Sequence, residues 1–125
     1  EQIFSAVGKY LWVEDHSINA VTAVSGSGPA YFYLFAEMMA LAGEELGLSK
    51  EDAVTLAKET LVGAGKMLAE GGRSPQELRE AVISPNGTTY EALEVFRQEG
   101  LQELVAKAMK ACYKRAEEME REYTG

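Results

Sequence analysis

Two short segments of this chain combine small hydroxyl residues with glycines at positions where we expect helices to begin. The first, Ser25–Pro29, reads SGSGP, and the second, Ser84–Thr89, reads SPNGTT. The start of a helix offers free backbone N–H groups and the positive end of the helix dipole, so it attracts carboxylates, phosphates and carbonyl oxygens. Two such starts in one small domain predict a single shared ligand site.

The second segment predicts a binding loop without a formal charge. Pro85 restricts one φ angle, the Asn86-Gly87 pair suits a turn with positive φ, and Thr88-Thr89 begin the next helix. The hydroxyl and N–H groups of the threonines would then point back at the loop and cradle a carboxylate. The alternative is a plain connection between two helices in which Thr88 or Thr89 is only an N-cap.

The first segment matches two well-known motifs only in part. Its two glycines could be half of a dinucleotide-binding fingerprint, but Tyr31 stands where the third glycine belongs and the preceding residues predict a helix. Ser27 between glycines suggests a nucleophile elbow, but Ser25 occupies the first glycine position and the one histidine, His16, lies in a polar turn. A Ser-His-acid hydrolase is therefore excluded, and the remaining alternative is a kink between helices with Ser27 as cap.

Composition describes one acidic globular domain. The chain has 125 residues, a formal charge of −8 and 46% hydrophobic residues. The acidic excess opposes nucleic acid and anionic membrane surfaces, and we expect neither a membrane span nor a signal peptide. The single cysteine, Cys112, is expected as a buried or half-buried thiol, which fits a reducing, cytoplasmic compartment. Because no Met begins the sequence, we expect it to start inside a longer gene product.

Capping residues and apolar periodicity predict an all-α fold. Ser49 with Asp52, and Ser74 with Glu77, form capping patterns at two helix starts, and Gly71-Gly72 ends a helix. We expect helices over residues 18–24, 29–47, 49–70, 74–83, 90–99 and 101–123. Residues 1–8 predict a short piece of helix, and residues 9–14 a strand.

The helix over residues 29–47 is apolar on nearly every face, so it must be buried on every side. A domain of this size has little room for such a helix, so we expect a second subunit to cover part of it. Gly63 and Gly65 would each cost the following helix about 1 kcal/mol relative to alanine, a cost that close helix packing in a dimer explains. Glu37 could be a general base, but we favour a structural role as a buried acid hydrogen-bonded across helices.

These motifs together resemble the carboxyl-terminal domain of the 1-pyrroline-5-carboxylate reductase family. Members carry T-A-x-S-G-S-G-P-A-Y, then an acidic residue in the following helix, then S-P-G-G-T-T. This chain has the first motif at residues 22–31, then Glu37, then Ser84–Thr89, and the resemblance runs over about residues 4–115. Asn86 stands where many members have glycine, and asparagine also tolerates left-handed backbone.

The resemblance implies a helical dimerisation and substrate-binding domain over residues 15–125, whose helices intertwine between two subunits. Residues 1–14 would be the end of a preceding dinucleotide-binding domain, and the homodimers can assemble further. The implied catalytic residue is Thr89, whose hydroxyl would hydrogen-bond the imine nitrogen. The implied substrate-binding residues are Ser84, Asn86, Gly87, Thr88 and Thr89, and those near the nicotinamide are Ser25, Gly26, Ser27 and Gly28.

The implied reaction is the reduction of 1-pyrroline-5-carboxylate to L-proline by NADPH or NADH, in proline biosynthesis. The cofactor would be bound mainly by a domain outside this chain, so we expect residues 1–125 alone to be inactive, and we expect no metal ion. Two alternatives remain: a catalytically inactive helical oligomerisation module, and a related reductase with a different imine or keto-acid substrate. Retention of both threonines and both motif glycines argues against the first, since a scaffold needs none of them.

Overall fold

The computed structural model describes residues 2–6, 9–13 and 18–124, which fall into two units. The first unit comprises Glu1–Tyr31 and Gly100–Gly125, and the second comprises Phe32–Glu99. All residues of the SGSGP segment belong to the first unit, and all residues of the SPNGTT segment belong to the second. His16 lies outside the described residues, so its expected place in a surface turn stays a prediction.

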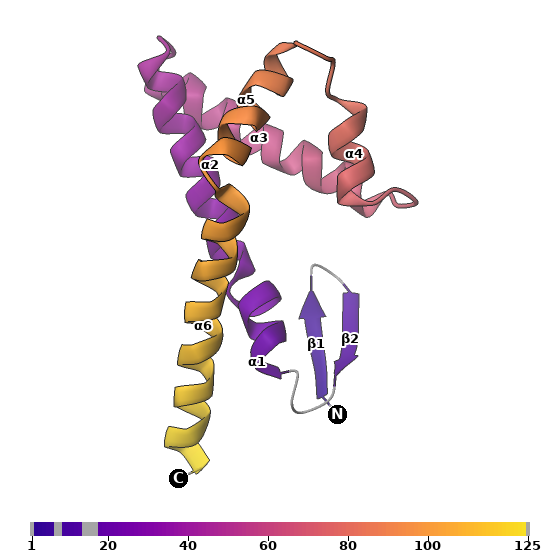
Figure 1. Cartoon of the computed structure of the whole chain (residues 1–125), viewed down its shortest axis with the longest axis vertical. Helices are drawn as coiled ribbons and strands as arrows, with labels where there is room; N and C mark the ends of the chain where they lie inside the picture. The colour runs from indigo at the N-terminus through magenta and orange to yellow at the C-terminus, as the bar shows by residue number, and fades with distance from the viewer. Residues whose placement is uncertain (1, 7–8, 14–17, 125) are drawn as a thin grey trace. The chain divides into compact units, whose positions relative to one another are not determined.

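The first unit contains a β-hairpin at the start of the chain (Figure 1). Strands β1 (Gln2–Ala6) and β2 (Lys9–Val13) pair antiparallel. The predicted strand is therefore confirmed at Lys9–Val13. The predicted piece of helix over residues 1–8 is wrong at Gln2–Ala6, because branched and aromatic residues there suit a strand and the neighbouring strand supplies backbone partners.

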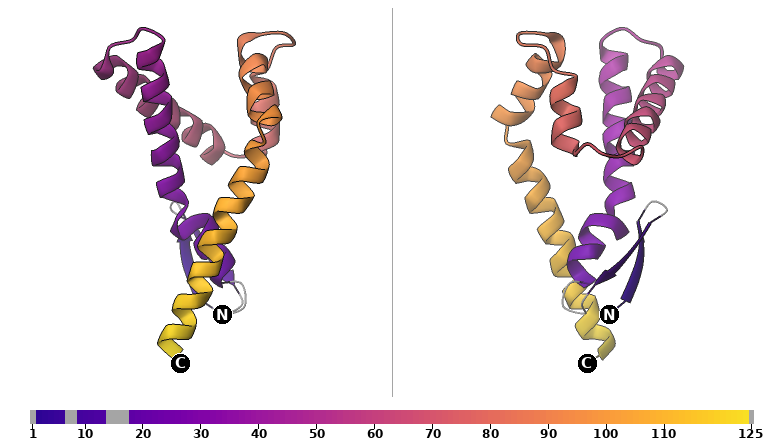
Figure 2. Two further views of the ribbon diagram at one scale, coloured as in Figure 1. Left: turned by 60° about the vertical axis from the view of Figure 1, so that its left-hand side comes forward. Right: turned by 90° about the vertical axis from the view of Figure 1, so that its right-hand side faces the viewer.

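The SGSGP segment of the first unit lies where one helical run ends and the next helix begins. Helix α1 (Ile18–Val21) continues directly into the π-helical turn η2 (Thr22–Gly26), and α2 (Gly28–Glu45) begins after Ser27. The break predicted at Ser25–Gly28 is therefore shorter than expected, since Ser27 is the one residue between η2 and α2. Helix α6 (Leu101–Thr124) contacts α1 and η2, and both views in Figure 2 show it beside them.

The second unit contains α2 from Phe32 onward, α3 (Lys50–Ala69), α4 (Pro75–Ala81) and α5 (Thr88–Gln98) (Figure 1). The helix boundaries follow the predicted ones within a few residues. The prediction of an all-α fold is therefore confirmed for the described chain from Ile18 onward. The exchange of helices between two subunits stays a prediction, since one protomer is described.

Few of the residues whose burial the structure describes, 18–123, are buried. The core of the second unit consists of Ala40, Ala53 and Ala57, and among the described residues no large side chain is fully buried. On α2, in contrast, the large apolar side chains are exposed, among them Phe32, Tyr33, Leu34, Phe35, Met38, Met39 and Leu41. Helix α2 therefore carries more apolar surface than its own chain covers. None of the described helices has the length and hydropathy needed to cross a membrane.

Candidate functional site

The SPNGTT segment forms a tight turn before α5. The N–H of Gly87 donates to the carbonyl of Ser84 at 2.9 Å, and Asn86 has φ 61°. A proline followed by a residue with positive φ is the arrangement of a type II turn. The predicted positive φ is thus confirmed at Asn86 but wrong at Gly87, which has φ −86°.

Position 87 requires glycine because a side chain would have too little room, and not because of its φ angle. A Cβ atom at this position would lie 3.1 Å from the Ser84 carbonyl oxygen and 3.3 Å from the Ser84 Cβ. Both separations are tighter than most Cβ contacts, and one of the neighbouring atoms is backbone, which cannot easily yield. The turn therefore has its present shape because this residue has no side chain.

The start of α5 is open. Gly87 is the N-cap residue and makes no side-chain capping bond, and its carbonyl accepts the N–H of Glu91 at 3.1 Å. The N–H groups of the first turn, at Thr88, Thr89 and Tyr90, have no carbonyl partner within a helix that begins there. Both threonine side chains are exposed. The alternative in which Thr88 or Thr89 serves as N-cap is therefore wrong, because both lie inside the helix.

No cation of this helix lies close to its start. Arg97 is in the last turn of α5, about 14 Å along the axis from Thr88, and donates to Glu94 at 2.8 and 3.2 Å. Arg79 lies on α4 at 3.8 Å from Glu80. An anion at the start of α5 would be held by backbone and hydroxyl donors and by the helix dipole.

The SGSGP segment is differently arranged. The N–H of Ser27 donates to the Thr22 carbonyl at 2.9 Å, the N–H of Ala30 donates to the Ser27 carbonyl at 3.1 Å, and Pro29 has no N–H. Most donors at the start of α2 are therefore used or missing, and Gly28 is buried. The two helix starts are not equivalent as anion sites, and the predicted shared site stays a prediction.

The hydroxyls of this segment differ from each other. Ser25 Oγ donates to the Val21 carbonyl at 3.0 Å within its own helix, whereas Ser27 Oγ lies 3.2 Å from Cys112 Sγ on α6. Cys112 is half-buried, as predicted. Its contact with Ser27 could not be found from the sequence, because the two residues are 85 positions apart and neither stands in a motif that links them.

Tyr31 closes this cluster from α2. Its hydroxyl donates to the Ala23 carbonyl at 2.8 Å. Burial is the main cause that raises the pKa of Tyr31, followed by its hydrogen bond and its electrostatic interaction with Cys112, while the Ser27 hydroxyl lowers it. The phenol therefore keeps its proton at neutral pH and remains a donor to the backbone of η2.

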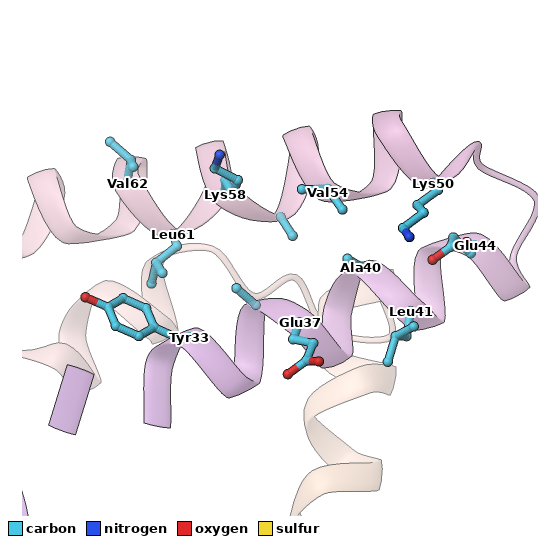
Figure 3. A pocket seen from close by; sticks show the side chains of 12 residues that line it. Tyr33, Glu37, Ala40, Leu41, Glu44, Lys50, Val54, Lys58, Leu61 and Val62 are labelled. Carbon is cyan, nitrogen blue, oxygen red and sulfur yellow. The ribbon is translucent and has the colours of Figure 1, made fainter. Parts of the chain in front are cut away.

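Glu37 does not lie in a buried network. It is exposed and lines a groove of about 620 Å³ between α2 and α3, and Figure 3 shows its carboxylate pointing away from α3. The preferred interpretation as a buried acid is therefore wrong for this chain, because α3 packs on another face of α2, at Ala40. The groove itself is mostly apolar, with Leu61 pointing from α3 toward Tyr33 (Figure 3).

Comparison with known proteins identifies the domain. Residues 15–119 match the family model described as pyrroline-5-carboxylate reductase dimerisation. A pyrroline-5-carboxylate reductase of Pseudomonas aeruginosa is 49% identical over 119 residues, covering 94% of this chain and 44% of that protein. One of Vibrio alginolyticus is 45% identical over 122 residues, covering 96% and 45%. The chain thus spans less than half the length of these relatives.

Solved structures agree with the sequence relatives. A pyrroline-5-carboxylate reductase from Coxiella burnetii superposes with a TM-score of 0.81 at 42% identity, over 86% of this chain and 40% of that one. The Plasmodium falciparum pyrroline carboxylate reductase, crystallised with NADP bound, gives 0.80 at 31% identity, over 86% and 41%. The fold of the matched residues is therefore that of a known reductase domain.

Proposed function

Because this chain belongs to the pyrroline-5-carboxylate reductase dimerisation family, we propose that it is the carboxyl-terminal part of an NAD(P)H-dependent enzyme that reduces 1-pyrroline-5-carboxylate to L-proline. The observation that carries this proposal is the open start of α5, where free N–H groups and exposed threonines follow a tight turn. A cyclic imine with a carboxylate substituent fits such donors. The activity belongs to the whole protein, and this chain supplies its substrate site.

The substrate carboxylate lies at the start of α5 in this proposal. The N–H groups of the first helical turn and the Thr88 hydroxyl donate to it, while Ser84, Asn86 and Gly87 shape the turn that leaves them free. Thr89 is the catalytic residue: its hydroxyl hydrogen-bonds the imine nitrogen and holds the ring in place for hydride transfer. The donors are in place before the substrate arrives, so binding requires little reorganisation.

Ser25, Gly26, Ser27 and Gly28 border the nicotinamide end of the cofactor in this proposal. Small residues suit close approach of a flat ring, but the start of α2 has few free N–H groups with which to hold the phosphates of a dinucleotide. The fit is therefore to the nicotinamide only, and the rest of NADPH or NADH is bound by another domain. The bound cofactor supplies the hydride.

In this proposal the enzyme acts as a homodimer in the cytoplasm. Dimers can assemble further, as the family resemblance implies. Support for the dimer comes from the alanine-only core and the exposed apolar face of α2. A Cβ at Gly63 or Gly65 would meet nothing within 4 Å in this chain, so no neighbour of its own explains these glycines. A second subunit would cover both surfaces. Sedimentation at micromolar concentration should find a dimer, and a well-folded monomer would contradict this proposal.

An assay of the full-length protein tests the function. Addition of 1-pyrroline-5-carboxylate should cause the full-length protein to oxidise NADPH or NADH, while residues 1–125 alone should give no activity. A full-length dimer that oxidises neither cofactor with this substrate would be the inactive oligomerisation module. Turnover of other cyclic imines or keto acids, without turnover of 1-pyrroline-5-carboxylate, would indicate a related reductase.

A further inference from the structure

The Ser27 hydroxyl depends for its position on a distant part of the chain. Its Oγ lies 3.2 Å from Cys112 Sγ, and both residues are half-buried where α6 contacts η2. Ser25, the other hydroxyl of the segment, donates to the Val21 carbonyl one turn earlier, in the continuous helical run of α1 and η2. Of these two serines, therefore, Ser27 is the one whose hydroxyl contacts a helix distant in sequence, α6.

The backbone of the same segment is held by Tyr31. Its hydroxyl donates at 2.8 Å to the carbonyl of Ala23, a buried residue of η2. Side chains from α2 and α6 thus contact the π-helical turn and the residue that ends it. A serine with fewer contacts samples more χ1 rotamers, so loss of Cys112 would loosen the Ser27 side chain, whose other neighbour is the Tyr31 hydroxyl. Tyr31 would still hold the backbone at Ala23.

We propose that Cys112 is a positioning residue for the reductase reaction, acting through Ser27 to fix the segment that borders the nicotinamide. This inference rests on the proposed function. Cys112 has no contact with substrate in this account, and its thiol undergoes no chemistry. Its effect on turnover passes through the Ser27 hydroxyl, while the Tyr31 hydroxyl keeps its bond to the Ala23 carbonyl.

A double-mutant cycle in the full-length enzyme tests this inference. Ser27→Ala and Cys112→Ala should each lower kcat by roughly three- to tenfold, the scale of one neutral hydrogen bond. The double variant should be no slower than the slower single variant, because both changes remove the same contact. Cys112→Ser, which restores a hydrogen-bonding group, should recover kcat to within about twofold of the wild type.

Met109→Ala is the matched control. Met109 is another half-buried residue of α6, one turn before Cys112, and its truncation removes more packing volume. It should lower thermal stability without changing kcat. Equal losses of kcat in Met109→Ala and Cys112→Ala, multiplicative effects in the double variant, or failure of Cys112→Ser to recover activity would each overturn the inference.

An NMR measurement separates this inference from the proposed function. Three-bond couplings at Ser27 should report one χ1 rotamer in the wild type and averaging over several in Cys112→Ala. One unchanged rotamer in both proteins would overturn the positioning role, whatever the activity. A wild-type enzyme without imine reductase activity would instead overturn the proposed function, and the Ser27 couplings would still decide whether Cys112 holds this side chain.

Discussion

Ser74 and Ser84 are each followed by proline, yet the first dipeptide begins a helix with a capping box and the second begins a turn before an uncapped helix. At Ser74 the hydroxyl accepts the N–H of Glu77 at 3.1 Å, and the Glu77 carboxylate accepts the N–H of Ser74 at 2.8 Å. At Ser84 the backbone carbonyl accepts the N–H of Gly87, and the helix begins only after that residue. Side chains at the first start accept two backbone N–H groups, those of Ser74 and Glu77, whereas no side chain caps the second start.

The difference comes from the two residues after each proline. Gln76 and Glu77 both favour helix, and the glutamate can complete a capping box. Asn86 accepts a left-handed conformation, and Gly87 allows the close approach of Ser84. A closed helix start stabilises the fold, whereas an open one has N–H donors to offer a ligand. In the proposed function these two tasks therefore fall to neighbouring helices.

The largest effect is expected when the two residues after Pro85 are replaced by those after Pro75. Asn86→Gln with Gly87→Glu would copy the α4 sequence onto the α5 loop and let the helix cap itself at Ser84. We expect kcat/KM for 1-pyrroline-5-carboxylate to fall at least about a thousandfold in the full-length enzyme, since several charge-assisted donors are lost together and a carboxylate is added. Steady-state kinetics and thermal unfolding should show lost activity without lost stability.

The reciprocal exchange in α4 is the matched control. Gln76→Asn with Glu77→Gly should lower stability and leave kcat/KM within about twofold, because the proposed function places the substrate at α5 and not at the capping box of α4. If the α5 exchange left activity intact, the carboxylate would have to bind elsewhere.

Thr89→Ala removes the one hydroxyl to which the proposed function gives a catalytic role. Turnover in the full-length enzyme should fall roughly ten- to a thousandfold, the scale expected when one positioned donor is removed from a reaction centre. Thr89→Ser keeps the hydroxyl and should retain kcat within about fivefold. An unchanged rate in Thr89→Ala would remove this residue from the site.

The features that sequence predicted best are those decided within one helical turn. The caps at Ser49 and Ser74 are local hydrogen bonds, so residue type and spacing were enough to place them. The positive φ at Asn86 was predicted for the same reason, although it was wrongly extended to Gly87. That error arose because glycine has two uses, positive φ and close packing, which a sequence alone does not separate.

Features that depend on distant residues were not predictable. Nothing near Ser27 indicates that Cys112 would lie against it, and the π-helical turn that orients Ser27 differs from an ordinary helix end by one residue of hydrogen-bond register. Glu37 was expected to be buried because its neighbours in sequence are apolar. Those neighbours are themselves exposed within one protomer, so their presence did not imply a covering layer from the same chain.

Ser74→Ala tests the closed helix start by its stability. Loss of the N-cap should lower the free energy of unfolding by about 1 kcal/mol, and substrate kinetics should stay unchanged. Denaturant unfolding of the wild type and the variant measures the difference. A large fall in kcat/KM would mean that α4 also contributes to the site.

The same cap predicts a pH dependence. Backbone and side-chain hydrogen bonds from Ser74 lower the pKa of Glu77 from its ordinary value of 4.5. Because the folded state favours the ionised carboxylate, this contribution is present above about pH 4.5 and is lost as the pH falls through the lowered folded pKa. The stability difference between wild type and Glu77→Gln should therefore shrink on acidification, and a difference that grows toward low pH would contradict the capping role.

The smallest expected effects concern the two arginines nearest in sequence to the open helix start. If backbone N–H groups, hydroxyls and the helix dipole hold the carboxylate, an acidic domain can bind an acidic substrate without a cation of its own. Arg97 is engaged with Glu94 at the far end of α5, and Arg79 lies beside Glu80 on α4. Arg97→Ala and Arg79→Ala should each leave the KM for the imine within about threefold of the wild type. A tenfold rise in KM in either variant, with full activity in the exchanged α5 loop, would show that an ion pair recognises the substrate and that the open start of α5 does not.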